Sequence, residues 1–255
     1  MLKNAVRVLF YSTVCCLMLF NTSHAQASSF TQTFDAECNG NDPNWYWNFY
    51  TGPFSSSANT YFMSGNASFN SGSLNLWITN NTYNYGNRQF TSAGCDTKYS
   101  DSRTYGKWEV RCRFPQGYGV QGYVGLFAKN GSWPPEVDFA EVVGRNPGQL
   151  VMTQHYNTNN TTAGTTVTGQ DWTSSWHTYS LEWTPGKLRY LIDGNLKMTQ
   201  NQNFSTTEMY LAIGTGCGDP GGWADSPNNS SWNGWNWPLP SNMQIDWVKI
   251  YQYNP

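Results

Sequence analysis

Charged side chains are scarce in this sequence of 255 residues. Lysine, arginine, aspartate and glutamate together make up 12% of the chain, against about 25% in an average protein. The 14 basic residues are slightly outnumbered by 16 acidic ones, so the sequence offers no strongly basic surface. We therefore exclude nucleic acid and anionic membranes as partners.

Signals for metal or nucleophilic chemistry are also few. The chain has three histidines, and its cysteines show none of the spacings of a zinc site. No glycine-flanked serine of the nucleophile-elbow type supports a Ser-His-Asp hydrolase. We expect that no cofactor is required.

A long apolar run occurs only at the N-terminus. Lys3 and Arg7 precede the apolar residues 8–20, and Ser23-His24-Ala25 has the small-x-small pattern of a signal peptidase site. The run is too short for a stable membrane anchor. We predict that residues 1–25 are a signal peptide and that the mature protein is secreted, or periplasmic, and free of the membrane.

Four cysteines remain beyond this segment, and they are Cys38, Cys95, Cys112 and Cys217. An oxidising compartment favours disulfides, and four cysteines allow three complete pairings. The sequence does not choose among these pairings. We expect at least one disulfide.

Aromatic and neutral polar residues take the place of charge. The chain contains 13 Trp, 16 Tyr and 13 Phe. Aromatic faces mixed with neutral hydrogen-bonding groups suit a polyol whose sugar rings stack on them. The composition therefore favours a carbohydrate ligand, and the alternative is that most of these rings fill a β core.

The remaining chain, 26–255, has the patterns of an all-β domain. Residues 74–78, 106–114 and 178–183 alternate apolar and polar side chains, as half-buried strands do. Thr184-Pro185-Gly186-Lys187 is typical of a turn between two strands. No stretch shows sustained helical periodicity. We predict one domain, a β-sandwich jelly roll whose concave face forms a substrate cleft.

Three carboxylates stand in one apolar segment, Glu136-Val137-Asp138-Phe139-Ala140-Glu141. Side chains two positions apart in a strand share a face, so Glu136 and Asp138 point the same way. Glu141 is at an odd offset from Glu136 and would face the opposite side unless the strand holds one extra residue. We predict a β-bulge around Phe139-Ala140.

With this bulge, the carboxyls of Glu136 and Glu141 approach the separation of about 5–5.5 Å that retaining glycosidases use. Neighbouring carboxylates on a half-buried sheet resist ionisation, which would keep one glutamate protonated near neutral pH. The alternatives are a solvated acidic strand edge or a calcium site.

Five segments together resemble glycoside hydrolase family 16, the secreted jelly-roll enzymes that include laminarinases, lichenases, agarases and carrageenases. They are 105–111, 133–147 with the three carboxylates, 176–185, 190–194 and 245–251. The resemblance covers nearly the whole chain after the signal peptide. It implies a concanavalin A-like sandwich and a secreted, retaining endo-β-glucanase that hydrolyses β-1,3 or mixed β-1,3/1,4 glucan.

The resemblance also implies a role for each carboxylate. Glu136 would be the nucleophile, Glu141 the acid and then the base, and Asp138 would assist between them. The carboxylate spacing is that of laminarinase-like, agarase-like and carrageenase-like members, whereas typical bacterial lichenases have one residue fewer.

Five aromatic and histidine residues are candidates for binding substrate. Trp133 would be an aromatic platform beside the catalytic strand, and His155 matches a position where laminarinase-like members often have histidine. Tyr123 lies where those members have a tryptophan-containing segment. Trp223 and Trp235 lie in a Gly/Asn/Pro-rich stretch that is typical of a loop, and their alternative role is to pack on one another.

The resemblance makes Asp246 a candidate ligand for a structural calcium ion. We expect a monomer whose partner is a polysaccharide. The alternatives to a glucanase are a non-catalytic lectin-like domain, a transglycosylase or a galactanase of the same fold. A sulfated galactan is disfavoured because the sequence has little clustered lysine or arginine to meet a polyanion.

Overall fold

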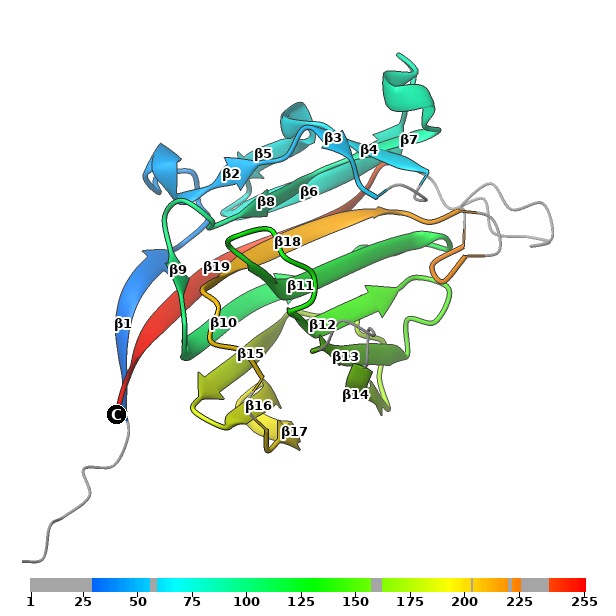
Figure 1. The fold of residues 1–255 in the computed structure, drawn as a ribbon. Helices are drawn as coiled ribbons and strands as arrows, with labels where there is room; N and C mark the ends of the chain where they lie inside the picture. Colours follow the sequence, from blue (N-terminus) through cyan, green and yellow to red (C-terminus); the bar gives the residue numbers. More distant parts are fainter. Residues whose placement is uncertain (1–28, 56–58, 157–161, 203, 220–221, 226–238) are drawn as a thin grey trace, which may run out of the picture.

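The computed structural model describes residues 29–55, 59–156, 162–202, 204–219, 222–225 and 239–255 (Figure 1). The predicted signal peptide, 1–25, and Trp235 lie outside these residues. Within them, no helix has the length and apolar character needed to cross a bilayer.

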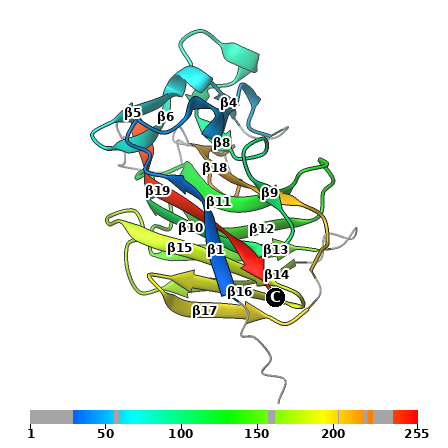
Figure 2. The ribbon, with the colours of Figure 1, turned by 90° about the vertical axis from the view of Figure 1, so that its left-hand side faces the viewer.

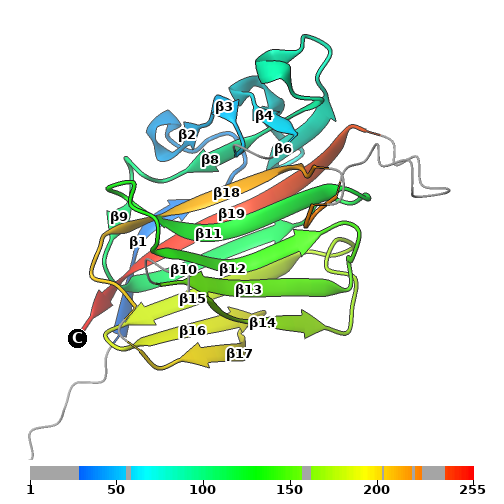
Figure 3. The same ribbon diagram turned by 45° about the vertical axis from the view of Figure 1, so that its right-hand side comes forward.

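Two sheets pack against each other, and most of their strand pairs are antiparallel (Figures 1 and 3). The first sheet has the order β17 (Asn195–Gln200), β16 (Lys187–Ile192), β15 (His177–Thr184), β10 (Gly106–Arg113), β19 (Ser241–Asn254), β6 (Ser73–Asn80), β7 (Phe90–Ser92), β4 (Thr60–Phe62) and β3 (Gly52–Pro53), with β1 (Ser29–Ala36) beside β19 and β5 (Ala67–Asn70) beside β6. The second sheet has the order β14 (Thr162–Thr168), β13 (Gln149–His155), β12 (Glu136–Val143), β11 (Val120–Ala128), β18 (Met209–Cys217), β8 (Gly94–Asp96) and β2 (Asn48–Phe49), with β9 (Ser102–Arg103) beside β18. Three short 3-10 helices lie outside the sheets, and they are η1 (Asn44–Tyr46), η2 (Ser64–Asn66) and η3 (Tyr85–Asn87).

The alternation of apolar and polar residues in the sequence corresponds to alternating buried and half-buried side chains in the strands. In β10, Trp108, Val110 and Cys112 are fully buried, while the residues between them are half-buried. Trp108 stacks on Trp183 of β15 inside the core, and each large apolar side chain buried in this way contributes about 1.5–3 kcal/mol. The predicted all-β sandwich is confirmed.

The predicted turn after β15 is also confirmed. Thr184 pairs with Lys187 across it, and Gly186 has a φ of +72°, which glycine adopts without strain. β15, β16 and β17 therefore form consecutive hairpins at one edge of the first sheet.

The expectation of a disulfide is wrong for this structure. Cys38, Cys95, Cys112 and Cys217 are all buried and all free. In the strand pairs of the described residues, Cys95 lies opposite Phe49 and Ile213, Cys112 opposite His177 and Ile245, and Cys217 opposite Val120. Cys38 follows β1 and lies near enough to Cys95 for the charge of that thiolate to raise the Cys38 pKa, but the two sulfurs are not bonded. Each thiol fills core volume as a small apolar side chain would.

The second sheet places the acidic strand at its centre. β12 lies between β11 and β13, and Figure 3 shows these three strands in front of β10, β15 and β16. Figure 2 shows that the N-terminal strand β1 runs beside the end of β19, away from β12. The middle of one sheet is a stiff position, suited to side chains that must hold a fixed geometry.

Candidate active site

A one-residue irregularity in β12 brings the three carboxylates to one face. Opposite β11, Asp138 pairs with Gly125 and Ala140 pairs with Val124, so Phe139 is the extra residue. The register with β13 also shifts between Asp138 and Glu141. Phe139 is fully buried, which anchors the irregularity in the core. The predicted β-bulge is confirmed.

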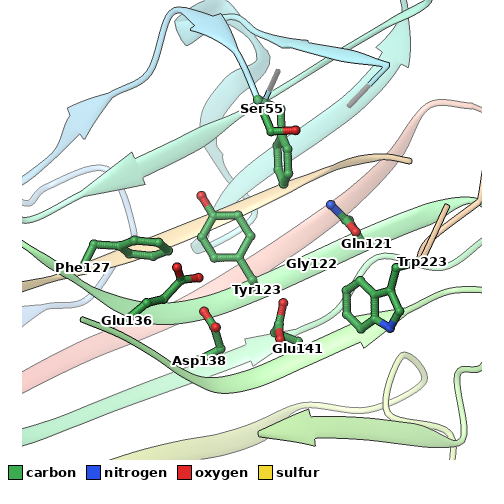
Figure 4. A pocket seen from close by; sticks show the side chains of 10 residues that line it. Ser55, Gln121, Gly122, Tyr123, Phe127, Glu136, Asp138, Glu141 and Trp223 are labelled. Atoms are coloured by element: carbon green, nitrogen blue, oxygen red, sulfur yellow. The ribbon is translucent and has the colours of Figure 1, made fainter. Parts of the chain in front are cut away.

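Glu136, Asp138 and Glu141 line one pocket of about 330 Å³ (Figure 4). They point into it side by side from the same strand. The rest of the lining comes from three other parts of the chain, and it consists of Phe54, Ser55, Gln121, Gly122, Tyr123, Phe127 and Trp223. The two glutamates therefore lie in one pocket, as predicted, while the separation of their carboxyls and their chemical roles stay predictions.

Burial and mutual repulsion hold protons on this group of carboxyls. Burial, and then the charge on Glu136, raise the pKa of Glu141 to about 8. Burial also raises the pKa of Asp138 well above its ordinary value, and so do the charges of Glu141 and Glu136 and a hydrogen bond to Glu136. At neutral pH the pocket therefore contains proton donors beside a carboxylate.

Trp133 and His155 lie beside Glu136. The Trp133 indole N–H donates a hydrogen bond to the Glu136 carboxylate, and the Trp133 ring lies 5.6 Å from the His155 ring. His155 pairs with Glu136 across β13 and β12, and its Nε2 is 3.9 Å from Oδ2 of Asp138. The structure thus places Trp133 and His155 beside Glu136, the candidate nucleophile. The Trp133 side chain is 55% exposed.

Tyr123 lines the same pocket from β11, directly opposite Glu141. Its ring makes edge contacts with Phe54 and Phe127, at centroid distances of 5.9 and 6.2 Å. Burial and the nearby Cys95 and carboxylates raise the pKa of Tyr123, so its phenol stays neutral. An aromatic side chain therefore occupies the pocket wall in the segment where the resemblance led us to expect a tryptophan.

Two glycines give these side chains their room, and our sequence analysis missed both. A Cβ on Gly125 would lie 2.6 Å from Oδ1 of Asp138, and a Cβ on Gly214 would lie 2.6 Å from the Tyr123 ring. Both glycines lie inside strands, and Gly125 pairs with Asp138 while Gly214 pairs with Tyr123. Glycine within a strand often marks such a close approach, and that signal was present in the sequence.

Trp223 lines the end of the pocket nearest Glu141 (Figure 4). It is 46% exposed, whereas its neighbours Ala224 and Asp225 are buried. The Tyr118 hydroxyl donates a hydrogen bond to the Asp225 carboxylate, which ties this segment to the residues just before β11. Trp223 is placed as predicted, and its role in binding stays a prediction.

Among the described residues, one cluster has the ligand types of a metal site. Glu136, Asp138 and His155 each offer one ligand atom, and these atoms lie within 4.8 Å of one another. Asp246 lies elsewhere, on β19 of the first sheet, where its carboxylate forms an ion pair with Arg111. Calcium binding at Asp246 stays a prediction.

The sequence matches one family model and several known proteins. The sequence model described as Glycosyl hydrolases family 16 matches residues 54–249. The chain is similar to an endo-1,3-1,4-beta-glycanase, ExsH, of Rhizobium meliloti (30% identity, 64% of this chain and 33% of that protein). It is also similar to a glucan endo-1,3-beta-glucosidase of Cryptopygus antarcticus (27% identity, 66% of this chain and 68% of that protein).

The fold has counterparts among solved structures. The laminarinase from Rhodothermus marinus superimposes with a TM-score of 0.75 at 23% identity, over 90% of this chain and all of that one. The chain spans about a third of the length of two Rhizobium meliloti relatives that it matches.

We expect Gly125→Ala to reduce catalysis at this pocket by about 100-fold while the protein stays folded. The new methyl group would lie 2.6 Å from Oδ1 of Asp138 and 3.1 Å from the Val137 carbonyl oxygen, and misplacement of an active-site group by about 1 Å can cost that much. The measurement is kcat/KM together with the thermal unfolding midpoint. Gly65→Ala, where nothing lies within 4 Å, is the control, and equal activities of the two variants would contradict the steric argument.

We expect Glu141→Gln to be more stable than the wild type at high pH. The pKa of Glu141 is raised from 4.5 to about 8 in the folded state, so the stability contributed by its protonated form is complete below about pH 4.5 and is lost as the pH rises to about 8. Glutamine does not ionise. Urea denaturation from pH 5 to 9 should show a growing advantage of the variant, about 1–3 kcal/mol at pH 8, and a difference independent of pH would refute the assignment.

Proposed function

This chain belongs to glycosyl hydrolases family 16, and on that premise we propose that it hydrolyses β-1,3 or mixed β-1,3/1,4 glucan within the polymer, with retention of configuration. The observation that carries the proposal is the pair of glutamates, Glu136 and Glu141, which a single bulge brings into one pocket. The names of the two similar glycan-cleaving proteins support a β-glucan as the substrate.

In the first step, Glu136 attacks the anomeric carbon and the bond from that carbon to the glycosidic oxygen breaks. Glu141 gives its proton to the departing oxygen, so the leaving sugar departs as a neutral alcohol. The raised pKa of Glu141 keeps this proton in place at neutral pH. The product of the step is a glycosyl ester on Glu136.

In the second step, Glu141 removes a proton from water and the resulting hydroxyl displaces Glu136 from the anomeric carbon. The charge on Glu136 contributes to the raised pKa of Glu141, and that charge disappears when Glu136 becomes an ester. The pKa of Glu141 therefore falls at the stage where it must act as a base. Two displacements at one carbon return the original configuration.

Asp138 and Trp133 support the nucleophile from two sides. Asp138 retains a proton because of its burial and its charged neighbours, and its hydrogen bond runs to Glu136. Trp133 donates a second hydrogen bond to the same carboxylate. These two hydrogen bonds fix the direction of the attacking oxygen of Glu136. After the ester forms, its carbonyl oxygen still accepts a hydrogen bond.

The pocket walls fit a neutral sugar. Phe127 lines the pocket beside Glu136, and Trp223 lies beyond Glu141, so a glycan crossing the pocket meets an aromatic side chain on each side of the carboxylates. Export, a monomeric state and independence from a cofactor are part of the proposal and rest on the sequence patterns.

The direct test is release of new reducing ends from barley β-glucan and laminarin. We expect the wild type to act on at least one of them, and we expect Glu136→Gln to lose at least about 1,000-fold in kcat because no covalent ester can form. The matched variant Glu182→Gln changes a glutamate of β15 that forms an ion pair with Arg189, and it should keep its activity.

Four outcomes would count against the proposal. Binding of both glucans without cleavage would favour a lectin, and longer oligosaccharides among the products would favour a transglycosylase. Cleavage of a galactan alone would move the substrate to a different sugar. An α-anomer as the first product, observed by proton NMR, would contradict the retaining mechanism.

The pH dependence of the rate tests the role of Glu141. Because the protonated form acts as the acid and its pKa is about 8, kcat/KM should fall as the pH rises through about 8, approaching tenfold per pH unit above it. Folding should be checked by circular dichroism at each pH. A kcat/KM that stays constant to pH 10 in folded protein would rule out Glu141 as the acid.

A further inference from the structure

Away from the acidic strand, the segment between β6 and β7 presents tyrosine rings to solvent. Tyr83 is 80% exposed and Tyr85 is 39% exposed, and their ring centroids lie 5.9 Å apart. Tyr85 stacks on Tyr61 of β4 at 6.0 Å and 24°. Figures 1 and 3 show this teal segment projecting beyond the sheets. We call Tyr61, Tyr83 and Tyr85 the tyrosine patch.

The backbone beneath the tyrosine patch is tightly held. The Asn81 side-chain amide donates to the carbonyl oxygens of Tyr85 and Arg88 at 2.9 and 2.8 Å, and its oxygen accepts from the Tyr85 N–H at 3.1 Å. A Cβ on Gly86 would lie 2.6 Å from the Tyr61 ring, so that ring packs directly on the glycine backbone. The rings of Tyr61 and Tyr85 are therefore positioned before any ligand arrives, which lowers the entropic cost of binding.

The same segment is fastened to the wall of the catalytic pocket. Asn59 and Gln89 bond reciprocally, with the Asn59 amide donating to the Gln89 side-chain oxygen and the Gln89 N–H donating to Oδ1 of Asn59, both at 2.8 Å. Arg88 donates to the carbonyl oxygen of Ser55 at 3.4 Å, and Ser55 lines the pocket that contains Glu136. The tyrosine patch therefore lies on the side of the pocket that Ser55 lines.

The chemistry of the patch selects a neutral ligand rich in hydroxyl groups. Residues 81–89 contain one charged side chain, Arg88, and otherwise consist of asparagine, threonine, tyrosine, glycine and glutamine. Aromatic faces bordered by amides match the apolar face and the hydroxyl rim of a sugar ring. Two rings on a projecting segment and a third on β4 form a small surface, whereas a stable protein interface needs about 800 Å² on each partner.

We propose that the tyrosine patch is a second carbohydrate-binding site, which holds a neutral polysaccharide strand outside the catalytic pocket. The identity of the polymer rests on the proposed function, because the strand held would be the one that the pocket cleaves. Attachment at two places on a rigid support raises the local concentration of polymer at the carboxylates. The benefit is confined to chains long enough to reach both places.

Native gels that contain barley β-glucan or laminarin test the patch without requiring catalysis. We expect the wild type to be retarded, Tyr83→Ala to lose about 2–10-fold in affinity, and Tyr83→Phe to keep it because the ring remains. The control is Trp45→Ala, which removes a ring that is 66% exposed outside both the pocket and the patch. For an oligosaccharide too short to reach the patch, kcat/KM of Tyr83→Ala should stay within twofold of the wild type, while KM for the polymer rises.

The outcomes separate this site from the catalytic proposal. Retardation of Tyr83→Ala equal to that of the wild type, or no retardation of the wild type in either gel, overturns the patch and leaves the glutamates untouched. Retardation that depends on Tyr83 in a protein that cleaves neither glucan supports the patch although the hydrolase proposal has failed. Equal losses in Trp45→Ala and Tyr83→Ala would also overturn it, because the effect would not be specific to the patch.

Discussion

Three carboxyl groups in one desolvated pocket cannot all be ionised, and the chemistry of the pocket depends on this constraint. The bulge at Phe139 sets the spacing that creates the crowding, and the crowding with burial raises the pKa of Asp138 and Glu141. Because the folded state raises the pKa of these two carboxyls, their ionisation at higher pH lowers the free energy of unfolding. A core with fully buried side chains such as Trp108 and Trp183 supplies the stability that offsets it.

On the pocket face of the second sheet, large side chains lie over glycine residues. Asp138 lies over Gly125, Tyr123 over Gly214, and Phe54 approaches Gly216. A sheet with a Cβ at every position would push these groups outward and close the space between them. Glycine weakens a strand, so the shape of the pocket is obtained at a cost to local sheet stability, as is common where a site must hold unusual geometry.

Local features of this chain could be predicted from its sequence, and features set by tertiary packing could not. Strand alternation, the turn at Thr184–Lys187 and the bulge at Phe139 depend on neighbours in the chain, and the structure has all three. Phe54 and Ser55 reach the pocket from a segment with no distinguishing pattern, so their position depends on the folded sheet. The disulfide expectation failed because the number of cysteines indicates a compartment but not which thiols lie close together.

The four buried thiols have a consequence for how this protein can be made and kept. Burial raises the pKa of Cys38, Cys95, Cys112 and Cys217, and the thiolate is the form that reacts with oxidants or glutathione. Burial and the raised pKa therefore protect these four thiols from such reagents while the protein is folded. Unfolding by heat or denaturant exposes these four thiols, so recovery from inactivation depends on the reductant in the surrounding solution even though the part of the chain that the structure describes contains no disulfide.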